Sequence, residues 1–152
     1  MMLRPGGLPI LAGIAWLLLS AAANAGELAG LWQQTDEDSG QPSALIRISA
    51  GADGTFEGVV ERYYPAPGEP ESPLCVHCPA KLHNSPIVGM KILDGLKRKD
   101  EYLFEGGQIL DPEEGKTYRC RMRLAPDGKT VKVTGYIGIS LLGRSESWTR
   151  QE

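Results

Sequence analysis

The strongest constraint on the fold is a strict alternation of side chains between residues 116 and 124. Every second residue is apolar or aromatic and the residues between them are arginines: Tyr118, Cys120, Met122 and Leu124 against Arg119, Arg121 and Arg123. A period of two indicates a β-strand, because successive side chains of a strand point to opposite faces. Such a strand needs paired neighbours to be stable in water, so the rest of the chain must supply a sheet.

Further candidate strands follow one another along the chain, with turn residues between them. Asp53-Gly54 and Asp127-Gly128 are dipeptides typical of tight hairpin turns, and Gly106-Gly107 is a third expected turn. The expected strands cover residues 30–34, 43–50, 55–64, 101–104, 107–110, 116–124, 131–139 and 144–150, with a strand entry and one helical turn in 87–96. The sequence therefore predicts an all-β fold, a single antiparallel barrel of about eight strands in up-and-down order.

The first and last expected strands carry residues that suit the closure of a barrel. Gly30 and Trp32 lie on the first strand, and Arg150 lies at the end of the last. We expect the indole of Trp32 to plug one end of the barrel, with the guanidinium of Arg150 over its face as a cation–π partner. Gly30 would let the backbone pass close beside the ring.

Residues 1–25 have the pattern of a secretory signal peptide. A short basic start reaches Arg4, an apolar run covers residues 8–22, and the small residues Ala23-Asn24-Ala25 precede Gly26. The apolar run is short for a membrane span, which needs roughly 20 residues. We therefore expect cleavage near Ala25, a periplasmic or secreted location, and one barrel domain over residues 26–152.

Charge and side-chain context bear on the class of function. The chain has a net charge of -3 at pH 7 and no clustered basic tract, which speaks against a nucleic-acid partner. No serine or cysteine lies in a recognisable context for activation as a nucleophile. The sequence therefore predicts neither catalytic residues nor a cofactor, and it does not favour an enzyme.

The segment 65–86 is too rich in proline to pair in a sheet, and it contains Cys75, Cys78, His77 and His83. In an oxidising compartment we expect Cys75 and Cys78 to form a disulfide that pins this long loop. Two alternatives stay open: a redox-active dithiol, and a zinc ion held by the two cysteines and the two histidines. Cys120, on the apolar face of its strand, is expected to be a buried thiol.

The inward faces of the expected strands predict a binding cavity. The expected interior residues are mostly apolar: Ile46, Phe56, Val60, Tyr118, Met122, Val133 and Ile137. Gly58 and Gly135, on the same faces, would leave space that larger side chains would have filled. Arg62 would add one interior cation and so favour an acidic ligand. We expect a small apolar or amphipathic ligand, such as a fatty acid, with Arg62, Phe56, Tyr118 and Gly135 among the residues that bind it.

Several motifs extend over most of the chain beyond residue 26. They are Gly30-Leu31-Trp32, Cys75-Val76-His77-Cys78-Pro79, Pro86-Ile87-Val88-Gly89, Gly107-Gln108-Ile109-Leu110-Asp111-Pro112, Gly115-Lys116-Thr117-Tyr118, Gly135-Tyr136-Ile137-Gly138, Gly143-Arg144 and Trp148-Thr149-Arg150. In this order they resemble the bacterial family called domain of unknown function 2147. The resemblance implies a lipocalin-like β-barrel in small exported proteins. It implies no reaction and brings no catalytic residues.

The sequence is therefore consistent with three functions. The first is a lipocalin-like protein that binds a small molecule in its barrel. The second is a thiol or zinc protein that works through the Cys75–Cys78 loop. The third is a non-catalytic envelope protein with a filled barrel that binds another protein. An interior cavity favours the first function and a filled core favours the third.

Overall fold

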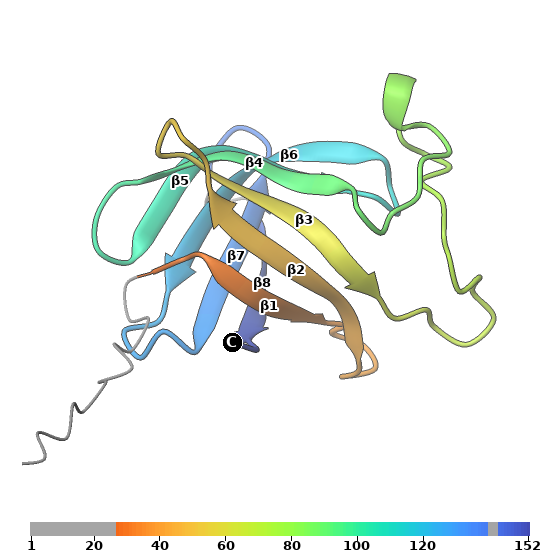
Figure 1. Cartoon of the computed structure of the whole chain (residues 1–152), viewed down its shortest axis with the longest axis horizontal. Helices are drawn as coiled ribbons and strands as arrows, with labels where there is room; N and C mark the ends of the chain where they lie inside the picture. The colour runs from red at the N-terminus through yellow and green to blue at the C-terminus, as the bar shows by residue number, and fades with distance from the viewer. Residues whose placement is uncertain (1–26, 140–142) are drawn as a thin grey trace, which may run out of the picture.

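Eight antiparallel strands close into a barrel in the computed structural model, which describes residues 27–139 and 143–152 (Figure 1). The strands are β1 (Gly30–Thr35), β2 (Pro42–Ala50), β3 (Phe56–Tyr63), β4 (Lys91–Arg98), β5 (Leu103–Asp111), β6 (Lys116–Leu124), β7 (Thr130–Tyr136) and β8 (Arg144–Arg150), with a short 3-10 helix η1 (Ala80–Leu82). The predicted all-β barrel of about eight strands is confirmed. The predicted signal peptide lies outside the described residues.

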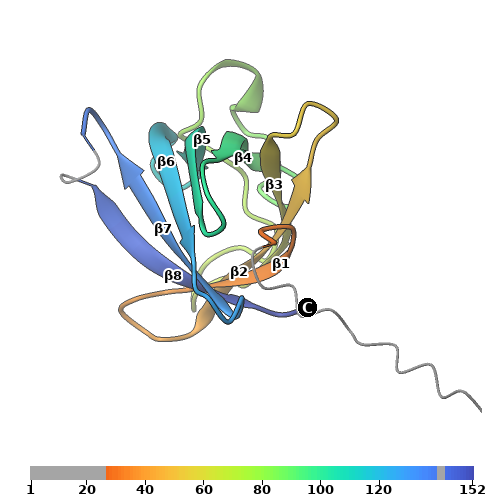
Figure 2. The same cartoon turned by 90° about the vertical axis from the view of Figure 1, so that its left-hand side faces the viewer.

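Each strand pairs with its neighbours in sequence, and the last strand pairs with the first (Figure 2). The closing pair is short, since β1 and β8 match Trp32 to Arg150 and Gln33 to Thr149. These two pairs join the last strand to the first and so close the barrel. No helix in the described part of the chain is long and apolar enough to cross a membrane.

The up-and-down order sorts the connections between strands into two ends. The connections after β1, β3, β5 and β7 lie at one end, which we call the loop end, and those after β2, β4 and β6 lie at the other, which we call the turn end. Figure 1 shows the long β3–β4 connection, in yellow-green and green, extending from the loop end on the right. The chain enters β1 from the turn end.

The core fills the turn end of the barrel with large apolar side chains. Phe56, at the start of β3, meets Phe104 edge-to-face with 5.2 Å between the ring centroids. Leu96 and Phe104 are completely buried there, and the inward face of β6 adds Met122 and Leu124. Burial of this apolar surface is the main source of the barrel's stability.

Several predicted strand boundaries are wrong, among them the end of the strand expected over residues 131–139, because β7 ends at Tyr136. Gly106-Gly107 is not a turn, because β5 runs through it with a register shift against β6 between Phe104 and Gly107. A Cβ atom at Gly107 would lie 2.7 Å from backbone atoms of Asp94 and Leu96, so the glycine allows β4 and β5 to approach closely. Residues 87–96 contain no helical turn, and β4 extends from Lys91 to Arg98.

Candidate binding cavity

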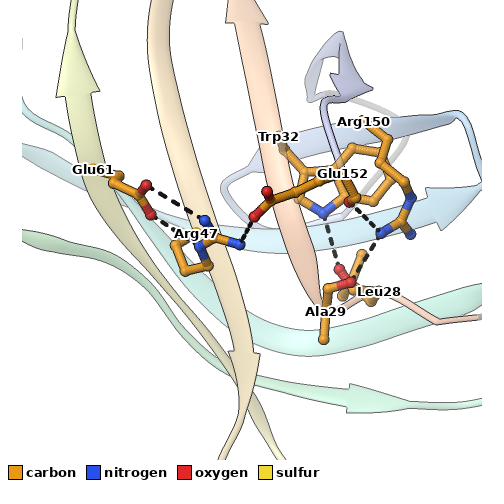
Figure 3. Close-up of polar contacts among 7 residues, drawn as sticks. All are labelled: Leu28, Ala29, Trp32, Arg47, Glu61, Arg150 and Glu152. Carbon is orange, nitrogen blue, oxygen red and sulfur yellow. Dashed lines mark hydrogen bonds and ion pairs between the residues drawn. The ribbon is translucent and has the colours of Figure 1, made fainter. Parts of the chain in front are cut away.

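The turn end of the barrel is closed by Trp32 and Arg150 (Figure 3). Trp32 is completely buried, and its indole Nε1 donates a hydrogen bond of 2.9 Å to the carbonyl of Leu28. The Arg150 guanidinium carbon lies 4.3 Å from the centroid of the Trp32 ring. Arg150 also donates through Nε to the carbonyl of Gly128 at 2.7 Å and through Nη1 to that of Ala29 at 2.9 Å. One side chain thus ties together the N-terminal segment, the β6–β7 turn and β8.

Gly30 makes room for this arrangement. A Cβ atom at Gly30 would lie 2.5 Å from Nη1 of Arg150, and the residue has a φ of 145°. A side chain would therefore meet both a steric clash and an unfavourable backbone conformation. The predicted contact between Trp32 and Arg150 is present, although the glycine accommodates the arginine and not the indole ring.

The loop end of the barrel contains a cavity of about 590 Å³. Its walls are inward-facing apolar side chains from six strands: Ala44, Val60, Ile92, Ile109, Val133 and Trp148. Its mouth is formed by the β1–β2 loop, the β5–β6 turn and the ends of β7 and β8. The barrel is therefore filled at the turn end and hollow at the loop end.

The two inward-facing glycines differ in what surrounds them. A Cβ atom at Gly135 would make ordinary contacts, the shortest being 3.5 Å to Cβ of Tyr118, and both residues line the cavity. A Cβ atom at Gly58 would lie 3.0 Å from Cβ of Leu93 and 3.3 Å from a methyl group of Ile46. The expectation that Gly58 leaves space is wrong, because Leu93 already fills that space.

Arg62 does not point into the barrel. The strand pairing matches Ile46 with Val60 and Leu45 with Arg62, so Glu61 is an extra residue in β3. This β-bulge reverses the alternation, and Tyr63 lines the cavity instead. Arg62 is exposed, with its guanidinium carbon 5.8 Å from the centroid of the Tyr64 ring.

Other expected lining residues also lie elsewhere, and two of them, Ile46 and Met122, are buried in the core without lining the cavity. Phe56 is packed against Phe104 at the turn end and is not part of the cavity wall. Ile137 lies beyond the end of β7, where it borders the mouth with 72% of its surface exposed. Tyr118 is half-buried in the wall, and its hydroxyl donates a hydrogen bond of 2.6 Å to Oε2 of Glu114.

The cavity lining is acidic. Seven of its described residues carry a carboxyl group and one, Arg144, carries a guanidinium; the acids are Asp36, Glu37, Asp38, Asp111, Glu113, Glu114 and Glu146. Desolvation raises the pKa of Glu113, and the carboxylates of Asp111, Glu69, Asp36 and Glu114 add to the effect. The mouth is therefore a region of negative potential.

Of the described acids that line the cavity, Glu146 alone lies inside a strand, since Asp111 ends β5 and the others lie in connections between strands. It pairs with Val133 across β7 and β8 and lies two residues from the buried Trp148, on the same inward face. Its Oε1 atom accepts a hydrogen bond of 2.7 Å from the indole of Trp148 and one of 2.8 Å from the amide of Gln34. Sequence reasoning missed this residue, although a regular strand over residues 144–150 has positions 146, 148 and 150 on one face.

Cys75 and Cys78 form a disulfide, as predicted from their spacing. Both are buried, with 0% and 3% of their surfaces exposed. The Sγ atom of Cys75 lies 3.2 Å from the carbonyl oxygen of Pro112, and a Cβ atom at Gly115 would collide with the carbonyl of His77. The disulfide loop is thus packed against the β5–β6 turn that carries Glu113.

This geometry bears on the thiol and zinc alternatives. The disulfide occupies both sulfur atoms that a zinc site would need, and no cluster of three metal-binding side chains occurs in residues 27–139 and 143–152. The burial of both sulfurs also limits exchange with another thiol. Cys120 is a free, fully buried cysteine, and burial followed by the charge of Glu146 raises the pKa of its thiol to about 12.

Comparison with known proteins identifies one family and one similar solved structure. Residues 30–150 match the family described as "Uncharacterized protein conserved in bacteria (DUF2147)". The solved structure, titled "Protein HP1028 from the human pathogen Helicobacter pylori belongs to the lipocalin family", has a TM-score of 0.71 at 21% sequence identity. The similarity covers 83% of this chain and 84% of that one, and at this identity it shows the lipocalin-like fold alone. No curated protein matched the chain.

Proposed function

The chain belongs to the DUF2147 family of bacterial proteins, and we propose that it binds a small amphipathic molecule inside its lipocalin-like barrel. The observation that carries this proposal is the cavity of about 590 Å³ at the loop end. Ligand sites in proteins are typically concave, about 300–1,000 Å³ in volume and mostly apolar, with a few polar groups that orient the ligand.

The distribution of side chains supports an amphipathic ligand over a purely apolar one. The inner wall offers Val60, Ile92 and Val133 to an apolar chain or ring, and the mouth offers carboxylates and the hydroxyl of Tyr118. A molecule with an apolar body and a polar head would bury the first part and leave the second near water. A filled core, as expected of the envelope-partner alternative, would have left no such space.

Fluorescence titration with N-phenyl-1-naphthylamine, an uncharged probe that brightens in apolar surroundings, tests the proposal. The wild-type protein should bind the probe saturably with a Kd in the micromolar range, about -8 kcal/mol. A leucine at position 135 would place its side chain beyond the Cβ position into the cavity, so Gly135→Leu should weaken binding at least tenfold. Gly135→Ala, which adds only the tolerated Cβ, is the matched control. Equal binding by Gly135→Leu and the wild type would contradict the proposal.

We also propose that the protein acts outside the cytoplasm, in the periplasm or after secretion. The pattern of residues 1–25 supports this location, as does the disulfide, because such bonds persist in oxidising compartments. Intact-mass spectrometry of protein from a periplasmic fraction should give the mass of residues 26–152 with one disulfide. Recovery of the full-length, reduced chain from the cytoplasm alone would contradict it.

A further inference from the structure

Two hydrogen bonds hold the carboxyl group of Glu146. Its side chain receives hydrogen bonds from Trp148 on its own strand and from Gln34 on β1. Both donors bind the same oxygen, Oε1. Two donors from different strands fix the carboxyl group in one orientation before any ligand arrives, which lowers the entropic cost of binding.

The second carboxyl oxygen of Glu146 is available. Across the described ranges, Oε2 accepts no hydrogen bond and Glu146 forms no ion pair. A carboxylate oxygen can accept more than one hydrogen bond, and Glu146 is a lining residue of the cavity. Glu146 is half-buried, and none of the described residues has a buried side-chain oxygen without a partner, so a donor carried by a ligand would take the place of water at this oxygen.

The charged residues around Glu146 determine which charge is favoured on a ligand group that donates to it. Apart from Arg144, which is exposed at the mouth, the charged residues of the described lining are acids. Lys132, next to Val133 in sequence, lies on the outward face of β7 and is exposed, and there it lines a second pocket together with Glu146. It is not among the residues that line the cavity. A ligand carboxylate would meet like charges on entering the cavity, whereas an ammonium group would meet opposite charges.

Aromatic side chains add a second attraction for a cation. Four of them line the cavity: Tyr63, Tyr118, Tyr136 and Trp148. The face of an aromatic ring is electron-rich and attracts an ammonium group, with larger effects where water is excluded. The apolar inner wall meanwhile suits a hydrocarbon chain or ring.

We propose that the cavity binds an organic cation, an apolar molecule with an ammonium head, and that Oε2 of Glu146 accepts a hydrogen bond from this head. The inference rests on the proposed function and specifies the chemical class of the ligand. It replaces the acidic ligand expected from the sequence, because Arg62, the residue behind that expectation, lies outside the barrel.

Competition between three ligands with the same chain tests this assignment. Dodecylammonium and dodecanoate, each below its micellar concentration at pH 7, and dodecanol, below its solubility limit, are each titrated against bound N-phenyl-1-naphthylamine. Since the apolar chain is constant, differences in displacement report on the head group. We expect dodecylammonium to displace the probe at a concentration at least tenfold lower than dodecanoate, with dodecanol between them.

Glu146→Gln separates the role of this carboxylate from that of the mouth. The glutamine carbonyl can still accept from Trp148 and Gln34, so the fold should be retained, and the three ligands are compared with one another within this variant. In this variant the concentrations of dodecylammonium and dodecanol that displace the probe should differ by no more than about threefold. That ratio equals a difference in binding free energy of roughly 0.7 kcal/mol or less. Glu71→Gln removes one charge from an exposed acid outside the cavity lining and should leave the preference unchanged.

The outcomes distinguish this inference from the proposed function. If the uncharged probe binds but dodecanoate competes as well as dodecylammonium, the charge class is wrong and the binding function stands. A cation preference that persists in full in Glu146→Gln would overturn the role of Glu146. Absence of saturable binding by the probe and by all three ligands would overturn the proposed function and this inference together.

Discussion

The guanidinium carbon of Arg150 lies 4.3 Å from the ring centroid of Trp32, and these two residues face each other across the strand pair that closes the barrel. The pairing between β1 and β8 is short, so side-chain contacts must supply much of the closure. The arginine does this by stacking on the indole and by donating to backbone carbonyls of two other segments.

Trp32→Ala should therefore destabilise the protein by about 3–5 kcal/mol, as expected for a large aromatic removed from a packed core. Arg150→Ala should cost less, because part of its surface is exposed, and it should shift the fluorescence maximum of Trp32. Urea denaturation followed by circular dichroism measures both effects. An unchanged urea midpoint in Trp32→Ala would show that the residue does not close the barrel.

Two glycines provide a paired test of how the interior is filled. Gly107→Ala should destabilise the protein by about 1–3 kcal/mol, because the new Cβ would collide with the backbone of β4. Gly135→Ala should change stability by less than about 1 kcal/mol, because its Cβ has ordinary contacts. Thermal melts of the two variants compare them directly. Equal destabilisation would contradict the placement of the cavity beside Gly135.

The alternation of side chains and the turn residues were sufficient to predict the barrel and its strand order. The contact between Trp32 and Arg150 was predicted from their places on the first and last strands. The alternation failed where a strand contains an extra residue. Glu61 and Arg62 are both polar, so nothing in their sequence marks the bulge that turns Arg62 outward. A Gly-Gly dipeptide is typical of a turn, and the prediction followed that pattern. Gly107 is instead required by the close approach of β4, a tertiary contact that the local sequence does not show.

The acidic mouth of the cavity could not be predicted from local patterns. Its carboxylates come from the β1–β2 loop, the β5–β6 turn and β8, which are far apart in the sequence and meet only when the barrel closes. Glu146 could have been found, because it shares the face of Trp148 and Arg150. An acid two residues before a tryptophan, on the same face of an expected strand, is a signal in its own right.

The double variant Cys75→Ser, Cys78→Ser tests what the disulfide holds. The ring is small and constrains the unfolded chain little, so the barrel should stay folded. Proteolysis around residues 69–84 should become faster, and because the loop packs on the β5–β6 turn, amide exchange at Glu113 and Glu114 should also rise. Cys120→Ala, which leaves the disulfide intact, is the control. Unchanged protection in the double variant would show that the loop is held without the disulfide.

The buried thiol of Cys120 gives a prediction on pH dependence. Its pKa rises from 9.0 to about 12 on folding, mainly through desolvation. Because the thiol keeps its proton more tightly in the folded state, its contribution to the free energy of unfolding is complete below about pH 9. This contribution is lost as the pH rises from about 9 toward 12. Cys120→Ala should therefore lose less stability over this range than the wild type. Rapid reaction of the native thiol with Ellman's reagent at pH 8, before unfolding, would contradict its burial.

The central claim, that a ligand occupies the loop end of the barrel, is tested most directly by the indole resonances of two tryptophans. Trp148 lines the cavity and donates its indole N–H to Glu146, whereas Trp32 closes the opposite end and donates to Leu28. Nitrogen–proton correlation spectra recorded while dodecylammonium is added should show a saturable shift of the Trp148 indole signal, with the Trp32 signal unmoved. Equal shifts of both signals, or movement of Trp32 alone, would contradict a ligand site inside the loop end.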